Sequence, residues 1–336
     1  MDPRLKTTTV AIPLPIALFV SLLTFTNIAD AHTAELDSEL QISGVAWAKA
    51  TYALNDDTMR VPDLDLYRLQ LWGTSRLGEQ WKGHFRLHAS TAPGILSAYD
   101  RAGSIFVYQA YLERREFLSP EGLLTLGVST NAFLRDLYRL HGTRFISRLL
   151  GQRMGYVTPT PLGIRYEYST PELSAALTLE QTATKPDSPS SHLIGAGTTV
   201  HWRPSQNWLL SSHVTHRHQS IDNQGARPSE SVFASTVSYH HSALVLSVET
   251  AGRYRSDSLE LGGGILAHLQ LYEAFHLFGQ VIGGNEAFQE SLGASINWRT
   301  GPLFQLEDAL QLALIIDAEH SDTNRYVLSL AASKQF

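Results

Sequence analysis

The chain ends with the sequence RYVLSLAASKQF, residues 325–336, which alternates between apolar and polar positions. On an extended strand, every second side chain points to the same face. One face would carry Tyr326, Leu328, Leu330, Ala332 and the terminal Phe336. The opposite face would carry Arg325, Ser329, Ser333 and Gln335. This alternation predicts a terminal β-strand that has one face in an apolar environment.

The first 31 residues are predicted to be a secretory signal peptide. Arg4 and Lys6 precede an apolar run at 11–25, and the triplet ADA at 29–31 has the small-x-small pattern of a cleavage site. A membrane anchor is the alternative, but the run contains two prolines and is shorter than the ~20 residues that a spanning helix needs. The mature chain is therefore expected to be 32–336.

The composition limits the class of protein. The chain contains no cysteine and has a formal net charge of −6. A secreted chain of this length without disulfides needs a large core or a closed sheet for its stability. The net charge is too small to indicate nucleic-acid binding. No segment after residue 31 is apolar enough to be a transmembrane helix.

Alternation of period two continues along nearly the whole mature chain, and predicts strands almost everywhere. Sixteen segments show this pattern, or fourteen if the two weakest segments are loops. They span residues 40–53, 62–78, 80–90, 103–118, 120–130, 161–170, 172–181, 192–203, 207–218, 230–241, 243–255, 258–271, 273–283, 286–299, 308–320 and 324–336.

The connectors between these segments alternate in length. Short connectors such as LGEQ and SPEG contain turn residues, and longer ones such as LNDDTMRVP and the stretch 131–160 lie between them. The alternation weakens near the C-terminus, where GGNE is short and RTGPLFQLED is long. Short turns on one side and long loops on the other are typical of an up-and-down β-barrel that spans a membrane.

The two faces of the strands differ in polarity. In the segment 81–90, Phe85 and Leu87 share one face, and Arg86 and His88 share the other. A soluble sandwich would bury the apolar face, whereas a membrane barrel turns it outward to lipid, where charges are costly. The strand number, the turn asymmetry and the signal peptide favour the membrane barrel. Its aromatic girdles are expected to include Trp47, Trp72, Trp81, Trp202, Trp208 and Trp298.

The terminal strand resembles the C-terminal signature of bacterial outer-membrane barrels, and the whole pattern resembles the Gram-negative trimeric porins. The resemblance implies that the barrel assembly machinery recognises Tyr326, Leu328, Leu330 and Phe336. Lys334 departs from the signature, because its place is usually apolar or aromatic. The resemblance also implies a homotrimer in the outer membrane, in contact with lipids and lipopolysaccharide, and a third long loop that folds into the lumen. An even number of strands puts both termini on the short-turn side, which would be the periplasm.

The third long connector, residues 131–160, has the sequence NAFLRDLYRLHGTRFISRLLGQRMGYVTPT. Its leucines recur at helical spacing. Its basic residues are Arg135, Arg139, Arg144, Arg148 and Arg153, opposed only by Asp136. One interpretation docks the leucines on the inner barrel wall, so that the arginines line a constriction and attract anions. The other is a basic extracellular helix that contacts lipopolysaccharide phosphates or a neighbouring subunit.

The inward strand face is predicted to carry further charges. The basic ones are Arg68, Arg76, Lys82, Arg86, Arg115, Arg165, Arg203, Arg217 and Arg253. The acidic ones are Glu113, Glu167, Glu180, Glu249, Asp317 and Glu319. They would either set up a field across the pore or form paired contacts that hold the wall together.

The sequence therefore predicts a passive channel for small hydrophilic solutes, with an anion preference, no catalytic residues and no cofactor. The histidines at 213, 216, 218, 240 and 241 do not have the spacing of a metal site. An outer-membrane phospholipase or protease is an alternative, but no G-x-S-x-G motif is present. A structural or adhesin barrel is a second alternative. The pattern does not identify the solute.

We expect Phe336 to act in assembly rather than in conduction, because the apolar row of the last strand ends on it. Deleting Phe336, or the substitution Phe336→Asp, should lower the amount of folded protein in outer-membrane fractions, measured by quantitative immunoblotting of the heat-modifiable band. The pores that do insert should conduct normally. Unchanged outer-membrane levels would count against this role.

Overall fold

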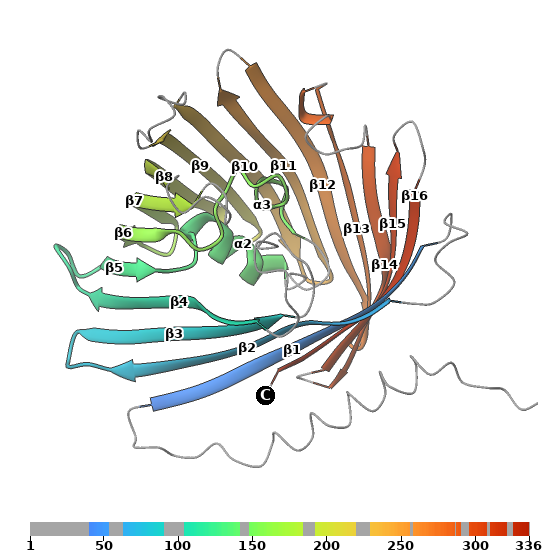
Figure 1. Cartoon of the computed structure of the whole chain (residues 1–336), viewed down its shortest axis with the longest axis horizontal. Helices are drawn as coiled ribbons and strands as arrows, with labels where there is room; N and C mark the ends of the chain where they lie inside the picture. The colour runs from blue at the N-terminus through green and yellow to red at the C-terminus, as the bar shows by residue number, and fades with distance from the viewer. Residues whose placement is uncertain are drawn as a thin grey trace, which may run out of the picture.

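The computed structural model describes residues 40–53, 63–90, 104–141, 148–183, 192–219, 229–255, 258–285, 287–289, 296–307, 310–320 and 325–335. Sixteen antiparallel strands in these residues close into one barrel, and two helices lie within the ring of strands (Figure 1). No helix in this part of the chain is long and apolar enough to cross a membrane. The predicted signal peptide, Arg144 and Phe336 lie outside the described residues.

The strands follow one another around the barrel in chain order. They are β1 (Leu40–Ala53), β2 (Asp63–Arg76), β3 (Trp81–Ser90), β4 (Ser104–Arg115), β5 (Gly122–Val128), β6 (Leu162–Ser169), β7 (Leu173–Ala183), β8 (His192–Ser205), β9 (Trp208–Gln219), β10 (Glu230–His241), β11 (Leu244–Arg255), β12 (Ser258–Tyr272), β13 (Phe275–Gly284), β14 (Ile296–Glu307), β15 (Leu310–His320) and β16 (Arg325–Gln335). The helices are α2 (Ala132–His141) and α3 (Leu150–Arg153).

The last strand closes the barrel against the first. β16 pairs with β1 from Val45 opposite Gln335 to Ala53 opposite Val327, and with β15 on its other side. Every strand therefore has two hydrogen-bonded neighbours. This confirms the predicted all-β, sixteen-stranded up-and-down barrel.

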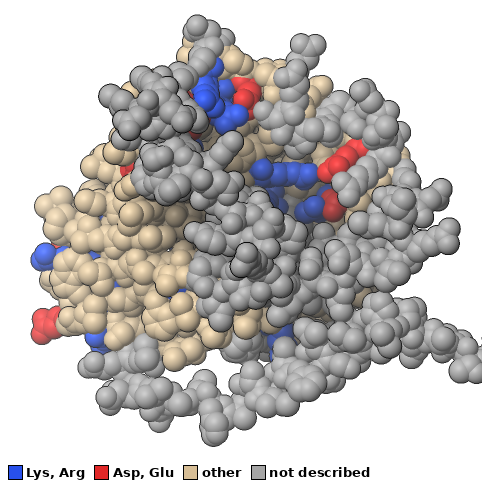
Figure 2. Space-filling model, viewed as in Figure 1, with Lys and Arg blue, Asp and Glu red and all other residues tan. Residues whose placement is uncertain are grey.

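The outer wall is apolar and the inner wall is polar. On β7, Leu177 and Leu179 are 62% and 61% exposed on the outer face, whereas Glu180 on the inner face is 3% exposed. In Figure 2 the outer wall at the left shows charged residues mainly along its edge, and further charged atoms lie in the opening. A soluble β-sandwich has the opposite arrangement, with its apolar face inside. The predicted direction of the two faces is confirmed.

The prediction for the fourteenth strand is wrong. A strand was expected at 286–299, but β14 spans Ile296–Glu307 and includes the residues TGP at 300–302, which resemble a turn. Gly301 allows the Leu314 carbonyl oxygen to come so close that a Cβ atom would lie 1.8 Å from it. Pro302 lacks a backbone N–H, and the pairing with β15 skips it, passing from Thr300 to Leu303.

Because β14 lies further along the chain than predicted, the connector lengths near the C-terminus are not reversed as expected. The connector between β14 and β15 is only residues 308–309, and the connector between β13 and β14 is residues 285–295. Every connector on the side of the barrel that carries the turn between β14 and β15 is therefore short. The other side is less uniform than expected, because the connectors after β11 and β15 span only 256–257 and 321–324.

Two of the six tryptophans do not belong to an outer girdle. Trp72 lies opposite Arg86 and beneath its guanidinium group, on the inner face. Trp47 lies opposite Ser333, again on the inner face, and is buried. Trp202 and Trp208 are exposed on the outer face, as expected for rings at a membrane interface.

Candidate functional site

The segment between β5 and β6 begins with a capped helix. The Asn131 side chain accepts a hydrogen bond from the Phe133 N–H at 2.9 Å, and its main-chain oxygen accepts one from the Arg135 N–H. Asn131 is therefore the N-cap of α2, a role that its residue type favours and that the sequence analysis missed. Within α2, Phe133, Leu134 and Leu137 share one face and are fully buried.

The loop packs its apolar residues on the inner barrel wall. Leu149, Leu150, Tyr156 and Val157 join the buried face of α2 in one hydrophobic cluster. The wall contributes Leu209, Val232, Ala234, Ala251, Ile282 and Phe288. The prediction that this loop folds into the lumen is confirmed, and the alternative of an external helix is excluded for α2 and α3.

Polar contacts fix the second half of the loop. The Glu249 side chain on β11 accepts the Leu150 N–H at 2.7 Å, at the start of α3. Gln280 on β13 donates to the Arg148 main-chain oxygen at 3.0 Å. Tyr156 donates to Glu260 at 2.7 Å, and Glu260 also binds Arg253 at 2.7 Å. Burial, and then the hydrogen bond and the charge of Glu260, raise the pKa of Tyr156.

Arg135 is held by two carboxylates. Its Nη1 and Nη2 atoms donate to both oxygens of Glu167 on β6, at 3.0 and 2.6 Å, and its Nε donates to Asp136 at 3.0 Å. Burial alone would lower the pKa of Arg135, but the hydrogen bonds and charges of Glu167 and Asp136 outweigh it and the pKa is raised. Two-pronged contacts of this kind fix orientation as well as charge, so Arg135 ties α2 to the wall.

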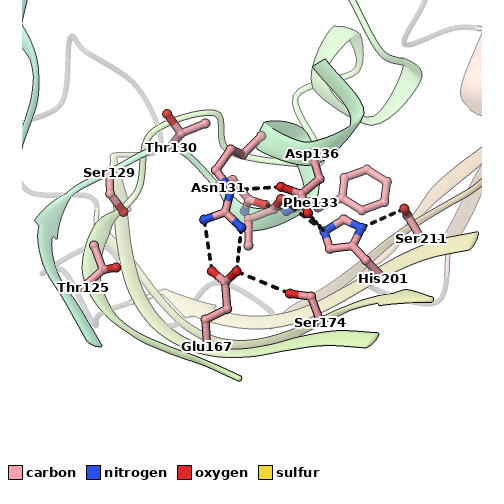
Figure 3. Close-up of polar contacts among 12 residues, drawn as sticks. Thr125, Ser129, Thr130, Asn131, Phe133, Asp136, Glu167, Ser174, His201 and Ser211 are labelled. Carbon is pink, nitrogen blue, oxygen red and sulfur yellow. Dashed lines mark hydrogen bonds and ion pairs between the residues drawn. The ribbon is translucent and has the colours of Figure 1, made fainter. Parts of the chain in front are cut away.

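Asp136 connects the same helix to β8 (Figure 3). It lies 3.5 Å from the Arg203 guanidinium and 4.0 Å from His201 Nε2. Burial would raise the pKa of Asp136, but Arg135, His201 and Arg203 lower it below its ordinary value. A lowered carboxylate pKa means that this contribution is present at neutral pH and is lost as the pH falls through the lowered pKa.

Arg165 on β6 holds the start of the loop. It donates to the Thr130 main-chain oxygen at 2.5 Å and lies 3.7 Å from Glu167. Three guanidinium groups, those of Arg135, Arg165 and Arg203, therefore meet the two carboxylates of Asp136 and Glu167. This group keeps one net positive charge.

Ser211, His201 and Asp136 follow one another in the order of a hydrolase triad (Figure 3). Ser211 Oγ lies 2.7 Å from His201 Nδ1, but His201 Nε2 faces the Ala132 main-chain oxygen at 3.2 Å and Asp136 is farther away. Ser211 and His201 are only 2% and 1% exposed. A nucleophile must reach its substrate, so this arrangement serves loop docking.

The other predicted loop arginines lie apart from this network. Arg139 is exposed on α2, and Arg148 is half-buried. Arg153, at the end of α3, is also half-buried, and burial together with the positive charge of Arg299 lowers its pKa against the opposing effect of Asp317 and Glu319. Arg299 itself binds Asp317 at 2.9 Å. Arg299 and Asp317 lie on β14 and β15, so the charges that act on Arg153 belong to that part of the wall.

The predicted wall residues divide into two sets. Arg165, Glu167 and Glu113 make the contacts expected of paired wall groups, and so do Arg217 with Glu180 at 3.3 Å and Arg253 with Glu260. Lys82 and Arg86 lie half-buried on the inner face, whereas Arg76 and Arg115 are exposed at the short-turn end. The side chain of Arg68 lies outside the described part of the chain. Within the described residues, no three His, Asp or Glu side chains are placed to hold a metal ion.

Comparison with known proteins identifies the fold. No family model matches the sequence, and no curated protein matches it. Among solved structures, OmpF of Salmonella typhi, in complex with daunomycin, aligns over 88% of this chain and 97% of its own, with a TM-score of 0.67 and 11% identity.

Two further structures agree. The trimer form of OmpT, an outer membrane protein of Vibrio cholerae, aligns over 88% of this chain and 99% of its own, with a TM-score of 0.61 and 9% identity. A mutant of Rh. blastica porin aligns over 88% of this chain and 100% of its own, with a TM-score of 0.57 and 11% identity. The chain has the fold of the outer-membrane porins.

We expect Arg135 and Glu167 to be energetically coupled. The substitution Arg135→Met leaves the buried Glu167 without its two strongest bonds, and should lower the free energy of unfolding by about 3 kcal/mol. The double variant Arg135→Met/Glu167→Met should lose less than the sum of the two single variants. Urea unfolding in lipid vesicles, followed by the heat-modifiable gel shift, measures both quantities.

Arg139→Met on the same helix is the matched control, because Arg139 is exposed. It should change the free energy by no more than about 0.5 kcal/mol. Strictly additive losses at Arg135 and Glu167 would contradict the coupling.

Proposed function

We propose that the chain is an outer-membrane porin, through which small hydrophilic solutes diffuse passively with a preference for anions. The observation that supports this is the loop between β5 and β6, whose leucines pack on the inner wall. A loop held inside a barrel narrows the water path, and fixed charges at a narrow place act with little screening. Its outer wall fits lipid, and its last strand fits recognition by the assembly machinery.

The charge of the loop supports the anion preference. The group around Arg135 keeps one net positive charge, and Arg139 and Arg153 add to it from the same loop. Asp136, the one acidic residue of the loop, is already engaged with Arg135 and Arg203. The negative net charge of the whole chain does not oppose this, because selectivity depends on charges close to the constriction.

An enzyme barrel has less support. Catalysis needs an activated nucleophile beside a base, within reach of a substrate. The Ser211–His201 pair has the contact but lies beneath α2 without exposure. A structural barrel would not need a loop that presents arginines inside it.

We expect Arg139 and Arg153 to set the charge selectivity. The double substitution Arg139→Glu/Arg153→Glu should lower or invert the anion-to-cation permeability ratio, which reversal potentials in a salt gradient report in planar bilayers. Arg135 is the wrong target for this test, because its replacement also removes the bonds that tie α2 to Glu167 on the wall. Each single substitution, Arg139→Glu or Arg153→Glu, has Arg255→Glu as its matched control, which makes the same two-unit charge change at the end of β11, where Arg255 is exposed.

The control should shift the ratio less, and its effect should disappear at 1 M salt, where the screening length is only about 3 Å. An unchanged ratio in a folded Arg139→Glu/Arg153→Glu variant places these arginines outside the conduction path. If the folded wild-type barrel conducts no ions, the proposed porin function is wrong.

We also propose that the barrel forms a homotrimer through the sector of β5 and β6. β5 has 7 residues and β6 has 8, while a membrane-spanning strand needs about 9–11. Their outer faces carry apolar side chains such as Ile164 and Tyr168. Strands this short do not span the apolar layer of the bilayer, and this mismatch is relieved if another subunit covers them. The OmpT structure with a similar fold occurs in a trimer form.

Single cysteines can test this contact, because the chain has none of its own. Ile164 and Ile265 are matched outward residues, 51% and 52% exposed, on β6 and β12. Spin labels on Ile164→Cys should give a shorter distance between subunits than labels on Ile265→Cys, measured by pulsed electron paramagnetic resonance. The reverse order would move the interface to the other side of the barrel, and no dipolar signal at either site would mean a monomer.

A further inference from the structure

The inner faces of β2, β3 and β4 carry a row of flat rings, outside the strands against which α2 and α3 pack. The His84 ring stacks on Tyr111 with centroids 4.6 Å apart and planes 12° apart. Two residues further along β3, the guanidinium carbon of Arg86 lies 5.2 Å from the centroid of the Trp72 ring. Beyond it, His88 meets Tyr108 edge to face at 5.3 Å. His88 and Tyr108 are buried, so the half-buried part of the row runs from His84 to Arg86, about 7 Å along the strand.

These rings differ from the apolar residues of the wall that the loop covers. Where α2 and α3 pack, on β8, β9, β11 and β12, apolar wall residues are explained by the leucines that cover them. Trp72, His84 and Tyr111 are only half-buried. The inner wall of a membrane barrel is ordinarily polar, because it faces water, so rings that keep part of their surface open need another reason.

Basic groups accompany the rings. Arg86 and Lys82 lie on the same inner face, and the nearby Glu113 is engaged by His84 at 3.0 Å. The row lies near the docked loop, because Gln109 beside it bonds Thr130 at the start of that loop.

We propose that the ring row, formed by Trp72, His84 and Tyr111 with Arg86, is a binding track for anionic solutes that carry a flat ring. The flat faces and edges of the side chains attract a planar π-system, and Arg86 and Lys82 attract its negative charge. Contacts repeated along the strand hold a passing solute weakly at several levels, which is what a conducting channel needs. This inference rests on the proposed channel function and adds a substrate class to it.

Benzoate and cyclohexanecarboxylate test the track, because they share charge and approximate size and differ in planarity. Titrating each into a planar bilayer containing the wild-type protein should reduce the ion current, with a half-blocking concentration roughly fivefold lower for benzoate. Tyr111→Leu and Trp72→Leu should abolish this preference, and Tyr111→Phe should keep it, because a ring remains. Trp202→Leu, on the outer face, should leave it unchanged.

Equal block by the two carboxylates, or a preference that survives Tyr111→Leu, would overturn the proposal and leave the rings as wall contacts only. If the folded barrel carries no current, the proposed channel function is wrong, and binding to the ring row is then measured without conduction. Saturation-transfer nuclear magnetic resonance on the protein in detergent should show transfer to benzoate, reduced in Tyr111→Leu and kept in Tyr111→Phe. Equal transfer to both carboxylates in the wild type would reject the track there too.

Discussion

The pairing of β16 with β1 is the contact on which the rest of the structure depends. A bilayer offers no hydrogen-bond partner to a backbone N–H or C=O, so a sheet can cross it only when its two edges meet. Here they meet along the register from Val45 and Gln335 to Ala53 and Val327. Closure also fixes which face is inside. Once the apolar residues face lipid, every charged side chain of the inner face must find a partner or water within the lumen.

That requirement explains how the wall holds its loop. Arg165, Glu167, Arg203 and Glu249 project from three different strands, β6, β8 and β11, and each of them contacts the segment between β5 and β6. The leucines of the loop supply the burial, and the ionic groups supply the position. Burial alone would let the loop slide over an apolar wall, because hydrophobic contact is not directional, whereas the two-pronged bond of Arg135 to Glu167 accepts one orientation.

Much of this fold was readable from sequence, because period-two alternation reports directly on strands that separate lipid from water. β14 was misplaced since Gly301 and Pro302 have the chemistry of a turn, and only the neighbouring strand β15 shows that they lie in a ladder. The site was predictable as a set of arginines in one loop. The partner of Arg135 was not, because Glu167 lies 32 residues away and meets it only after closure. Trp72, by contrast, has the same period-two parity as the predicted inward residues Arg68 and Arg76, so the alternation already indicated an inner ring, against the girdle expectation.

β5 and β6 pair with each other without a gap, from Gly122 opposite Tyr168 to Val128 opposite Leu162, although the whole loop departs between them. The loop thus joins the ends of two strands whose hydrogen-bonded pairing is complete without it. The pairing of β5 with β6 does not depend on the length or charge of this loop, so the selectivity of the channel can change while the scaffold of the barrel stays the same.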